Sequence, residues 1–203
     1  MDFVLEIPNN LSKEICEDII KRFEKDSRSS RGVVGIDGSI RPIKKSLDLM
    51  ISAYQKEWSD IDEYLHKQLG KGIEKYKEHL KKIGVGYALA HVLDGGAIND
   101  TGYQVQKTVQ GEFYSWHSDS CAKDGRFLTF LWYLTTHDNI QEGGQTGFHQ
   151  CVGDGGKLVV PEQGKLLIFP ATWTYLHSGL AFAPTDENNI KYICTGWLHS
   201  PNT

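Results

Sequence analysis

Hydrophobic positions follow two different spacings along this chain, and the change comes near Gly84. Before it, apolar residues recur with a period of about 3.6 among charged residues, which is the pattern of an amphipathic helix. The first such run predicts a helix that begins near Asn10 or Ser12. Its apolar positions are Leu11, Ile15, Ile19, Ile20 and Phe23. A stripe of this kind is the face that a helix packs against a sheet.

A second run of helical spacing extends from Trp58 to Leu80. It predicts either one long helix or two helices broken at Gly70–Gly72, because a glycine costs about 1 kcal/mol in a helix interior. A short β-prone segment, Phe3–Pro8, precedes both helices.

Residues 27–45 follow neither period and are rich in serine, glycine, arginine and lysine. A loop of this length inside a compact domain is often a lid or a substrate-binding segment. A solvated surface loop has the same composition, so both interpretations stay open.

From Gly84 onward, short apolar or alternating runs are separated by glycine-rich turn signals. The turn signals are Asp94–Gly96, Gly143–Gly144 and Asp154–Gly156. This spacing predicts an all-β sandwich or barrel. We therefore expect an α+β protein of one domain, residues 1–203. Residues 1–82 would be a helical support region with a short leading strand, and residues 83–203 a β core.

Composition and charge narrow the class of protein. The 22 basic and 26 acidic residues give a net charge of −4, which argues against nucleic-acid binding through phosphate contacts. Four scattered cysteines without a C-x-x-C pair predict reduced thiols rather than a disulfide framework or a zinc site. The acidic N-terminus lacks a signal-peptide pattern, and no apolar run reaches the ~20 residues of a membrane span. We expect a cytoplasmic protein that does not bind membranes.

Three residues have the chemistry of a metal site. If residues 114–119 end a strand, its alternation places His117 and Asp119 on one face. His177 follows Leu166–Pro170, a clearly predicted strand. Two histidines and one carboxylate leave three adjacent positions open on a metal, which suits non-haem Fe(II) enzymes. Without the third residue the H-x-D pair is a weak signal, and the alternative is a polar turn at the end of a strand.

Lys191 lies among apolar residues on what is predicted to be the last strand. An unpaired buried charge is costly, so a lysine there needs a partner. A dicarboxylate co-substrate, a protein carboxylate or exposure on the solvent face would each satisfy it.

Together these residues resemble the Fe(II)/2-oxoglutarate-dependent dioxygenases, and within them the prolyl 4-hydroxylases. The resemblance extends over Tyr103–His199. It implies a double-stranded β-helix (jelly-roll) core over about residues 84–199. It also implies Fe(II), 2-oxoglutarate and O₂ as requirements, with ascorbate as a further candidate. The iron ligands in the family match His117, Asp119 and His177.

The same resemblance implies a co-substrate site. The family's late basic residue, which binds the remote carboxylate of 2-oxoglutarate, matches Lys191. The threonine of its E-G-G-E-T segment matches Thr146, here within the sequence EGGQT. Tyr133 and Thr195 are further candidates. Where the family has a tyrosine before H-x-D, this chain departs from the pattern, and Thr108 is the available hydroxyl.

The substrate contacts of the algal and collagen-type prolyl hydroxylases match Arg126 and His199. Trp116 is an additional candidate, although such an aromatic residue more often belongs to a core. The resemblance implies an oxidoreductase that hydroxylates a prolyl residue in a peptide or protein and releases succinate and CO₂. Two alternatives stay open. One is hydroxylation of another side chain or of a free amino acid, and the other is a catalytically silent jelly-roll module that binds a peptide or sugar. The oligomeric state is also open.

Overall fold

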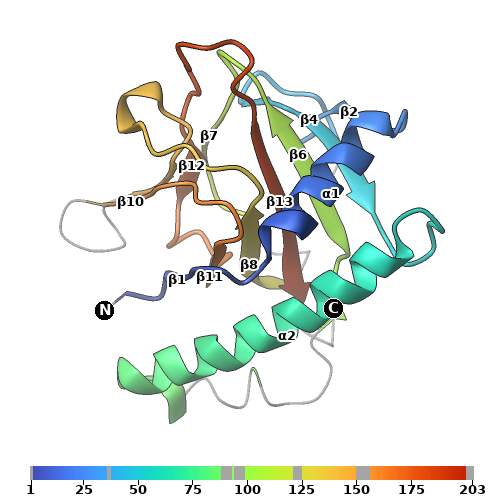
Figure 1. The fold of residues 1–203 in the computed structure, drawn as a ribbon. Coiled ribbons are helices and arrows are strands. Elements are labelled where there is room, and N and C mark those ends of the chain that lie inside the picture. Colours follow the sequence, from blue (N-terminus) through green and yellow to red (C-terminus); the bar gives the residue numbers. More distant parts are fainter. Residues whose placement is uncertain are drawn as a thin grey trace.

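The computed structural model describes residues 2–35, 38–87, 93, 99–120, 125–149 and 156–199. Two helices and two antiparallel sheets form this part of the chain (Figure 1). In order across the large sheet the strands are β1 (Leu5–Ile7), β11 (Leu166–Pro170), β8 (Arg126–Tyr133), β13 (Lys191–His199), β6 (Tyr103–Thr108), β4 (Leu47–Ile51) and β2 (Ser30–Arg31), and β5 (Asn99–Asp100) also pairs with β13.

The small sheet packs against the large one. In order across it the strands are β10 (Lys157–Val159), β9 (Thr146–Phe148), β12 (His177–Gly179), β7 (Phe113–His117) and β3 (Lys44–Lys45). A short 3₁₀ helix, η1 (Ile140–Glu142), precedes β9. A cluster of buried side chains lies between the two sheets, with Phe148 of β9 against Phe169 of β11 at a ring-centroid distance of 4.9 Å.

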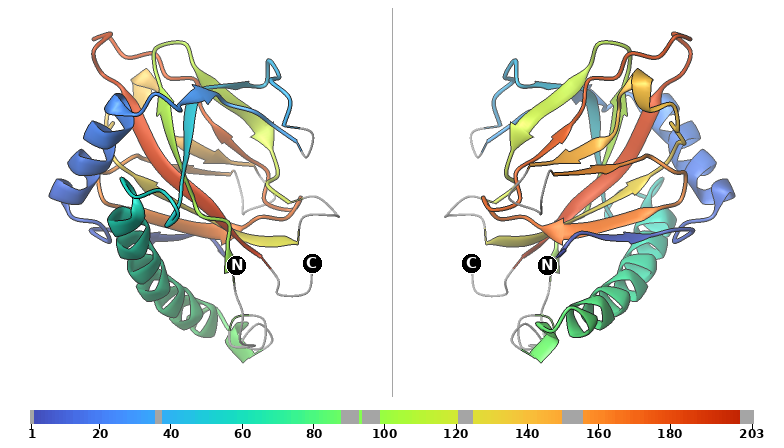
Figure 2. Two further views of the ribbon diagram at one scale, coloured as in Figure 1. Left: turned by 90° about the vertical axis from the view of Figure 1, so that its right-hand side faces the viewer. Right: turned by 90° about the vertical axis from the view of Figure 1, so that its left-hand side faces the viewer.

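The first helix, α1 (Lys13–Lys25), begins at Ser12, whose hydroxyl oxygen accepts a hydrogen bond from the Ile15 amide. Such a cap satisfies one of the unpaired amides at a helix start. The second helix, α2 (Ser59–Lys82), runs without a break through Gly70 and Gly72. The structure thus selects the single long helix. Both helices lie on one side of the molecule, against the large sheet (Figure 2).

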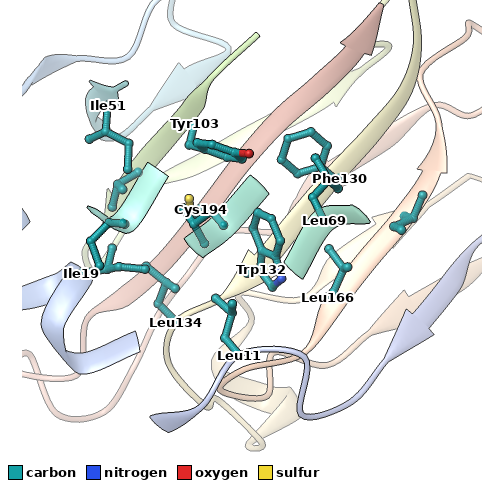
Figure 3. Close-up of a cluster of buried hydrophobic side chains, with 14 of the residues drawn as sticks. Leu11, Ile19, Ile51, Leu69, Tyr103, Phe130, Trp132, Leu134, Leu166 and Cys194 are labelled. Atoms are coloured by element: carbon teal, nitrogen blue, oxygen red, sulfur yellow. The ribbon is translucent and has the colours of Figure 1, made fainter. Parts of the chain in front are cut away.

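The main core fills the space between these helices and the large sheet (Figure 3). Ile19 of α1, Leu69 of α2 and Trp132 of β8 are among its buried members. Fully burying one such side chain stabilises the fold by about 1.5–3 kcal/mol. The helices therefore support the large sheet from outside and leave its other face to the small sheet.

The predicted leading strand, the two helices and the β core are confirmed, and so is the expected double-stranded β-helix arrangement. The first 82 residues nevertheless carry more strands than the single one expected. Segment 27–45 contains β2 and β3, and β4 follows it. Leu47, Leu49 and Ile51 alternate along β4, but this signal is short, and the neighbouring two-residue strands form only through pairing with distant segments.

Several sequence features lie outside the described residues. They are Cys121, Cys151, the turn signal Asp94–Gly96 and most of the turn signal Asp154–Gly156. Within the described part, no helix combines the length and the apolar character that a membrane crossing needs.

Candidate active site

Three predicted metal ligands meet between the sheets. His117 ends β7, His177 begins β12, and the two residues are paired across these strands. Asp119 lies two residues beyond β7. Its Oδ1 is 3.5 Å from His117 Nε2 and its Oδ2 is 3.3 Å from His177 Nε2. The three potential ligand atoms all lie within 4.8 Å of one another.

The backbone fixes the orientation of both imidazole rings. His117 Nδ1 is 2.7 Å from the Ser115 carbonyl oxygen, and His177 Nδ1 is 3.1 Å from the Tyr175 carbonyl oxygen. A carbonyl can only accept, so the proton of each neutral ring is assigned to Nδ1. Both Nε2 lone pairs are then free to bind a metal, as in other metal sites with histidine ligands.

The carboxylate of Asp119 is also held in place. Thr129 donates its hydroxyl hydrogen to Asp119 Oδ2 at 2.7 Å, and the Asp119 amide donates to the Ala171 carbonyl oxygen at 3.1 Å. The residue therefore has little freedom to turn away from the two histidines.

Burial and charge set the ionisation of the three groups. Burial lowers the pKa of His117. Burial alone would raise the pKa of Asp119, but its electrostatic interactions with His177 and His117 hold it well below its usual value. A carboxylate beside neutral imidazole nitrogens is a donor set that fits Fe(II), and an ion there would have three sites open for other ligands. Among the described residues no second group of three such side chains is found.

A pocket extends from these residues between the two sheets. Lys191, at the start of β13, lies in its wall and is 5% exposed. Its ammonium donates to the Gly144 carbonyl oxygen. Burial lowers the pKa of Lys191 to about 8. A buried cation therefore lies in the same pocket as the three candidate ligands.

The predicted co-substrate residues fall into two groups. Thr108, Thr146 and Thr195 line the pocket, and Thr108 is directly opposite Lys191 in the β6–β13 pairing. Tyr133 is fully buried behind this wall, and its hydroxyl donates to Thr146 Oγ1 at 2.7 Å. Tyr133 therefore reaches the pocket only through Thr146.

The predicted substrate residues lie apart from this pocket wall. Arg126 and His199 are paired across β8 and β13. The Arg126 guanidinium donates to the Asp119 carbonyl oxygen at 3.2 Å and lies 3.9 Å from the Trp197 ring centroid. Both residues are thus at the end of the large sheet nearest Asp119.

Trp116 is 49% exposed. Its ring lies over Gly147 of β9, next to Leu158. Because side chains alternate along a strand, Gly147 faces away from the side to which the pocket-lining Thr146 points. Trp116 therefore lies on the outer face of the small sheet.

Sequence reasoning did not assign several residues of the pocket to the site, among them Tyr114, Lys44 and Ser46. Tyr114 stacks on His117 with ring centroids 3.5 Å apart, because an irregularity in the β7–β12 pairing brings both onto one face. Lys44 lies in segment 27–45, for which a substrate-binding role is one of two open interpretations, and it lines the pocket together with Ser46, just beyond that segment. Only the pairing of β3 with β7 places them there, and no local pattern signals such a distant pairing.

Comparisons with known proteins agree with this site. Residues 103–199 match the family model of the 2OG-Fe(II) oxygenase superfamily. No curated protein sequence matches the chain significantly.

Solved structures with the same fold include three prolyl hydroxylases. The enzyme from Trichoplax adhaerens, in complex with a peptide fragment of the hypoxia inducible factor oxygen degradation domain, is 20% identical. Its TM-score is 0.74, over 98% of this chain and 84% of that one. The viral collagen prolyl hydroxylase of Paramecium Bursaria Chlorella virus-1, in complex with 2OG, is 19% identical, with a TM-score of 0.67 over 98% and 96% of the two chains. The Pseudomonas putida prolyl-4-hydroxylase is 15% identical, with a TM-score of 0.70 over 100% and 95%.

Two histidines and one carboxylate inside a double-stranded β-helix are the arrangement of a non-haem iron oxygenase. The chain matches the model of the 2OG-Fe(II) oxygenase superfamily over residues 103–199, the part that carries this site. It is accordingly an Fe(II)- and 2-oxoglutarate-dependent dioxygenase that requires Fe(II), 2-oxoglutarate and O₂, as the sequence predicts.

Proposed function

We propose that the protein hydroxylates a prolyl residue in a peptide or protein and converts 2-oxoglutarate to succinate and CO₂. The observation that carries the proposal is the buried lysine, Lys191, in the same pocket as His117, Asp119 and His177. These three side chains would hold Fe(II), and the bound metal supplies O₂ activation and binds the keto acid end of 2-oxoglutarate. The pocket supplies the rest of the co-substrate site.

Lys191 would bind the remote carboxylate of 2-oxoglutarate. Among the described residues its ammonium has a hydrogen-bond acceptor only in the Gly144 carbonyl, although an ammonium has three donors. A carboxylate would accept from the others in a charge-assisted bond, the stronger kind. The incoming anion would also compensate the charge that burial disfavours.

The threonines have different parts in this proposal. Tyr133 donates to Thr146 Oγ1, so the Thr146 hydroxyl hydrogen is left to donate to the carboxylate. Thr195 already donates to the Phe130 carbonyl oxygen at 2.8 Å, so it offers the pocket only a lone pair and a methyl group. Thr108 faces Lys191 from the neighbouring strand and is a second donor.

The prolyl substrate is supported by the fold comparison and by the position of two residues. The similar structures are prolyl hydroxylases, and one of them is in complex with a peptide fragment. Arg126 and His199 lie side by side next to Asp119, where we propose that they contact the peptide. Trp116, on the outer face, would contact only a substrate that extends around the edge of the sheet. Ascorbate is proposed as the reductant that keeps the iron in the Fe(II) state.

A substrate panel tests this proposal. The iron-loaded protein is supplied with 2-oxoglutarate, ascorbate and O₂. It receives a proline-rich peptide, the same peptide with alanine for proline, or free L-proline. We expect the mass of one oxygen atom to be added only to the first peptide, at proline, as located by fragment mass spectrometry. If oxygen is added to another residue, or only to free proline, the substrate is the corresponding alternative and not a prolyl peptide.

A further inference from the structure

A second buried lysine faces the pocket. Lys44, on β3, has a side chain that is 4% exposed, and its ammonium is 2.5 Å from Asp48 Oδ2. The ammonium also lies 5.3 Å from the centroid of the Tyr114 ring, which stacks on His117. Neither the metal site nor the co-substrate site described above uses this lysine.

Gly32 and Asp48 lie against Lys44 on the sides away from the pocket. A side chain at Gly32 would begin 2.5 Å from Ser46 Oγ and 2.8 Å from Lys44 Cε, so backbone covers the cluster there. Asp48 lies behind the wall, where its Oδ1 accepts the Ser46 hydroxyl hydrogen at 2.7 Å. Lys44 and Ser46 line the pocket, whereas Asp48 does not.

The hydrogen-bond donors of the Lys44 ammonium, at the β3 edge of the small sheet, are only partly satisfied. Within the described part of the chain, the Lys44 ammonium donates to Asp48 alone, and an ammonium has three donors. A buried ion pair repays its desolvation only when its remaining donors are also satisfied. An acceptor that enters the pocket would satisfy them.

Strand order separates Lys44 from Thr146 by the two strands that carry the histidines. Across the small sheet the sequence is β9, β12, β7 and β3. Thr146 is on β9, the two histidines are on β12 and β7, and Lys44 is on β3. In the proposed function 2-oxoglutarate would reach from the three metal ligands toward Thr146 and Lys191, so an acceptor at Lys44 would belong to the other reactant.

The charges at this edge favour a peptide over a free amino acid. Lys44 and Asp48 together are neutral, and among the described residues Asp119 is the only carboxylate that lines the pocket. A free amino acid brings an ammonium that would find no carboxylate of its own there. A peptide group is neutral and brings a carbonyl oxygen that matches the Lys44 donors. Lys45 also lines the pocket, but it is exposed and its ammonium lies 5.4 Å from the Phe113 ring centroid.

We propose that Lys44 is a specificity-determining residue, whose ammonium donates a hydrogen bond to a main-chain carbonyl oxygen of a peptide substrate. Asp48 and Ser46 hold the ammonium in position. The inference rests on the proposed peptide hydroxylation and adds the residue that selects a peptide over a free amino acid.

The test uses the double variant Lys44→Met/Asp48→Asn, which removes the ion pair without leaving one buried charge behind. The matched control is Lys67→Met/Glu63→Gln, which removes an ion pair of the same spacing whose two side chains are 65% and 69% exposed. Binding of a proline-rich peptide is measured by fluorescence anisotropy on protein loaded with Mn(II) and 2-oxoglutarate. We expect the peptide Kd of the first variant to rise about tenfold or more, as for a lost hydrogen bond to a charged group. The control variant should bind the peptide as the wild type does.

A thioamide scan of the peptide keeps the test independent of how well the variant folds. Sulfur replaces one carbonyl oxygen at a time and is a poorer acceptor. One position should weaken binding to the wild type, and the same change should cost nothing further in the double variant, which is the result for a direct contact.

Three outcomes would overturn the inference. The first is an unchanged peptide Kd in the double variant, or a scan without any sensitive position, and it leaves the proposed function intact. The second is a rise in the 2-oxoglutarate Kd equal to that for the peptide, which would assign Lys44 to the co-substrate. The third is a wild type that binds no peptide, which removes the prolyl proposal as well.

Discussion

The metal site depends at the residue scale on which nitrogen of each histidine faces Asp119. The backbone carbonyl oxygens of Ser115 and Tyr175 accept hydrogen bonds from Nδ1 of His117 and His177. The Nε2 lone pairs of both rings therefore converge on one point. This second layer of contacts is what makes three ordinary side chains a binding site.

His177→Ala should reduce 2-oxoglutarate turnover to background and weaken Mn(II) binding, because one of three ligands is lost. The fold should remain, since the lost hydrogen bond to Tyr175 is worth only about 1 kcal/mol. Turnover is measured as succinate, metal binding by titration and folding by circular dichroism. The control is His66→Ala, which removes a histidine from the exposed face of α2. Near-normal turnover in His177→Ala would show that the ligand is misassigned.

The lowered pKa of Lys191 predicts that co-substrate binding depends on pH. Burial lowers its pKa to about 8, so the cation predominates below that pH and is lost above it. The 2-oxoglutarate Kd should therefore be level below pH 8 and rise by about tenfold per pH unit above it. Burial also lowers the pKa of nearby His137 to about 4, so this neighbour stays neutral over the range. Lys191→Arg should move the rise to higher pH, and a rise unchanged in that variant would contradict the assignment.

At the scale of elements, sequence patterns predicted the helices and strands whose formation depends on their own local sequence. The helical period and the Ser12 cap predicted α1, and apolar runs predicted β11 and β13. The strands β2 and β3 have two residues each and no period of their own. They form because β4 and β7 offer partners, which is a property of the assembled sheets.

Two glycines of α2 differ in their surroundings, and the same substitution should have opposite effects. Gly70 has no neighbouring atoms within reach of a new Cβ, so Gly70→Ala should raise the free energy of unfolding by up to about 1 kcal/mol. At Gly72 a Cβ would lie 2.5 Å from Leu166 Cδ2 in the core, so Gly72→Ala should lower it by about 1–3 kcal/mol. Urea unfolding measures both. Equal changes in the two variants would contradict the close packing of α2 on β11.

At the scale of the whole molecule, the site forms where the two sheets face each other. The small sheet carries His117, His177, Thr146 and Lys44, and the large sheet carries Lys191. Sequence reasoning predicted the residues with strong chemistry, because two histidines, an aspartate and a buried lysine are rare in this pattern. It did not predict Tyr114, Lys44 or Ser46, whose positions depend on a strand irregularity and on a pairing between distant segments.

A metal ion and 2-oxoglutarate bound in this site would contact residues of both sheets. They should therefore stabilise the whole fold against unfolding. Mn(II) at a hundred times its Kd should raise the free energy of unfolding by about 2.7 kcal/mol, and 2-oxoglutarate at a hundred times its Kd by about as much again, by mass action. Thermal unfolding in the presence and absence of both measures this, and a chelator should reverse the effect. An unfolding temperature that neither ligand changes would mean that the pocket does not bind them in the folded protein.

The most direct test of the whole account is to measure succinate and hydroxylated peptide in one reaction. The iron-loaded protein is exposed to O₂ with 2-oxoglutarate and a proline-rich peptide, and Asp119→Ala is run beside it. We predict equal amounts of the two products from the wild type, and neither from Asp119→Ala or from wild type without iron. Succinate that no peptide stimulates would contradict the assigned substrate. No succinate from folded, iron-loaded wild type would contradict the assigned catalytic site.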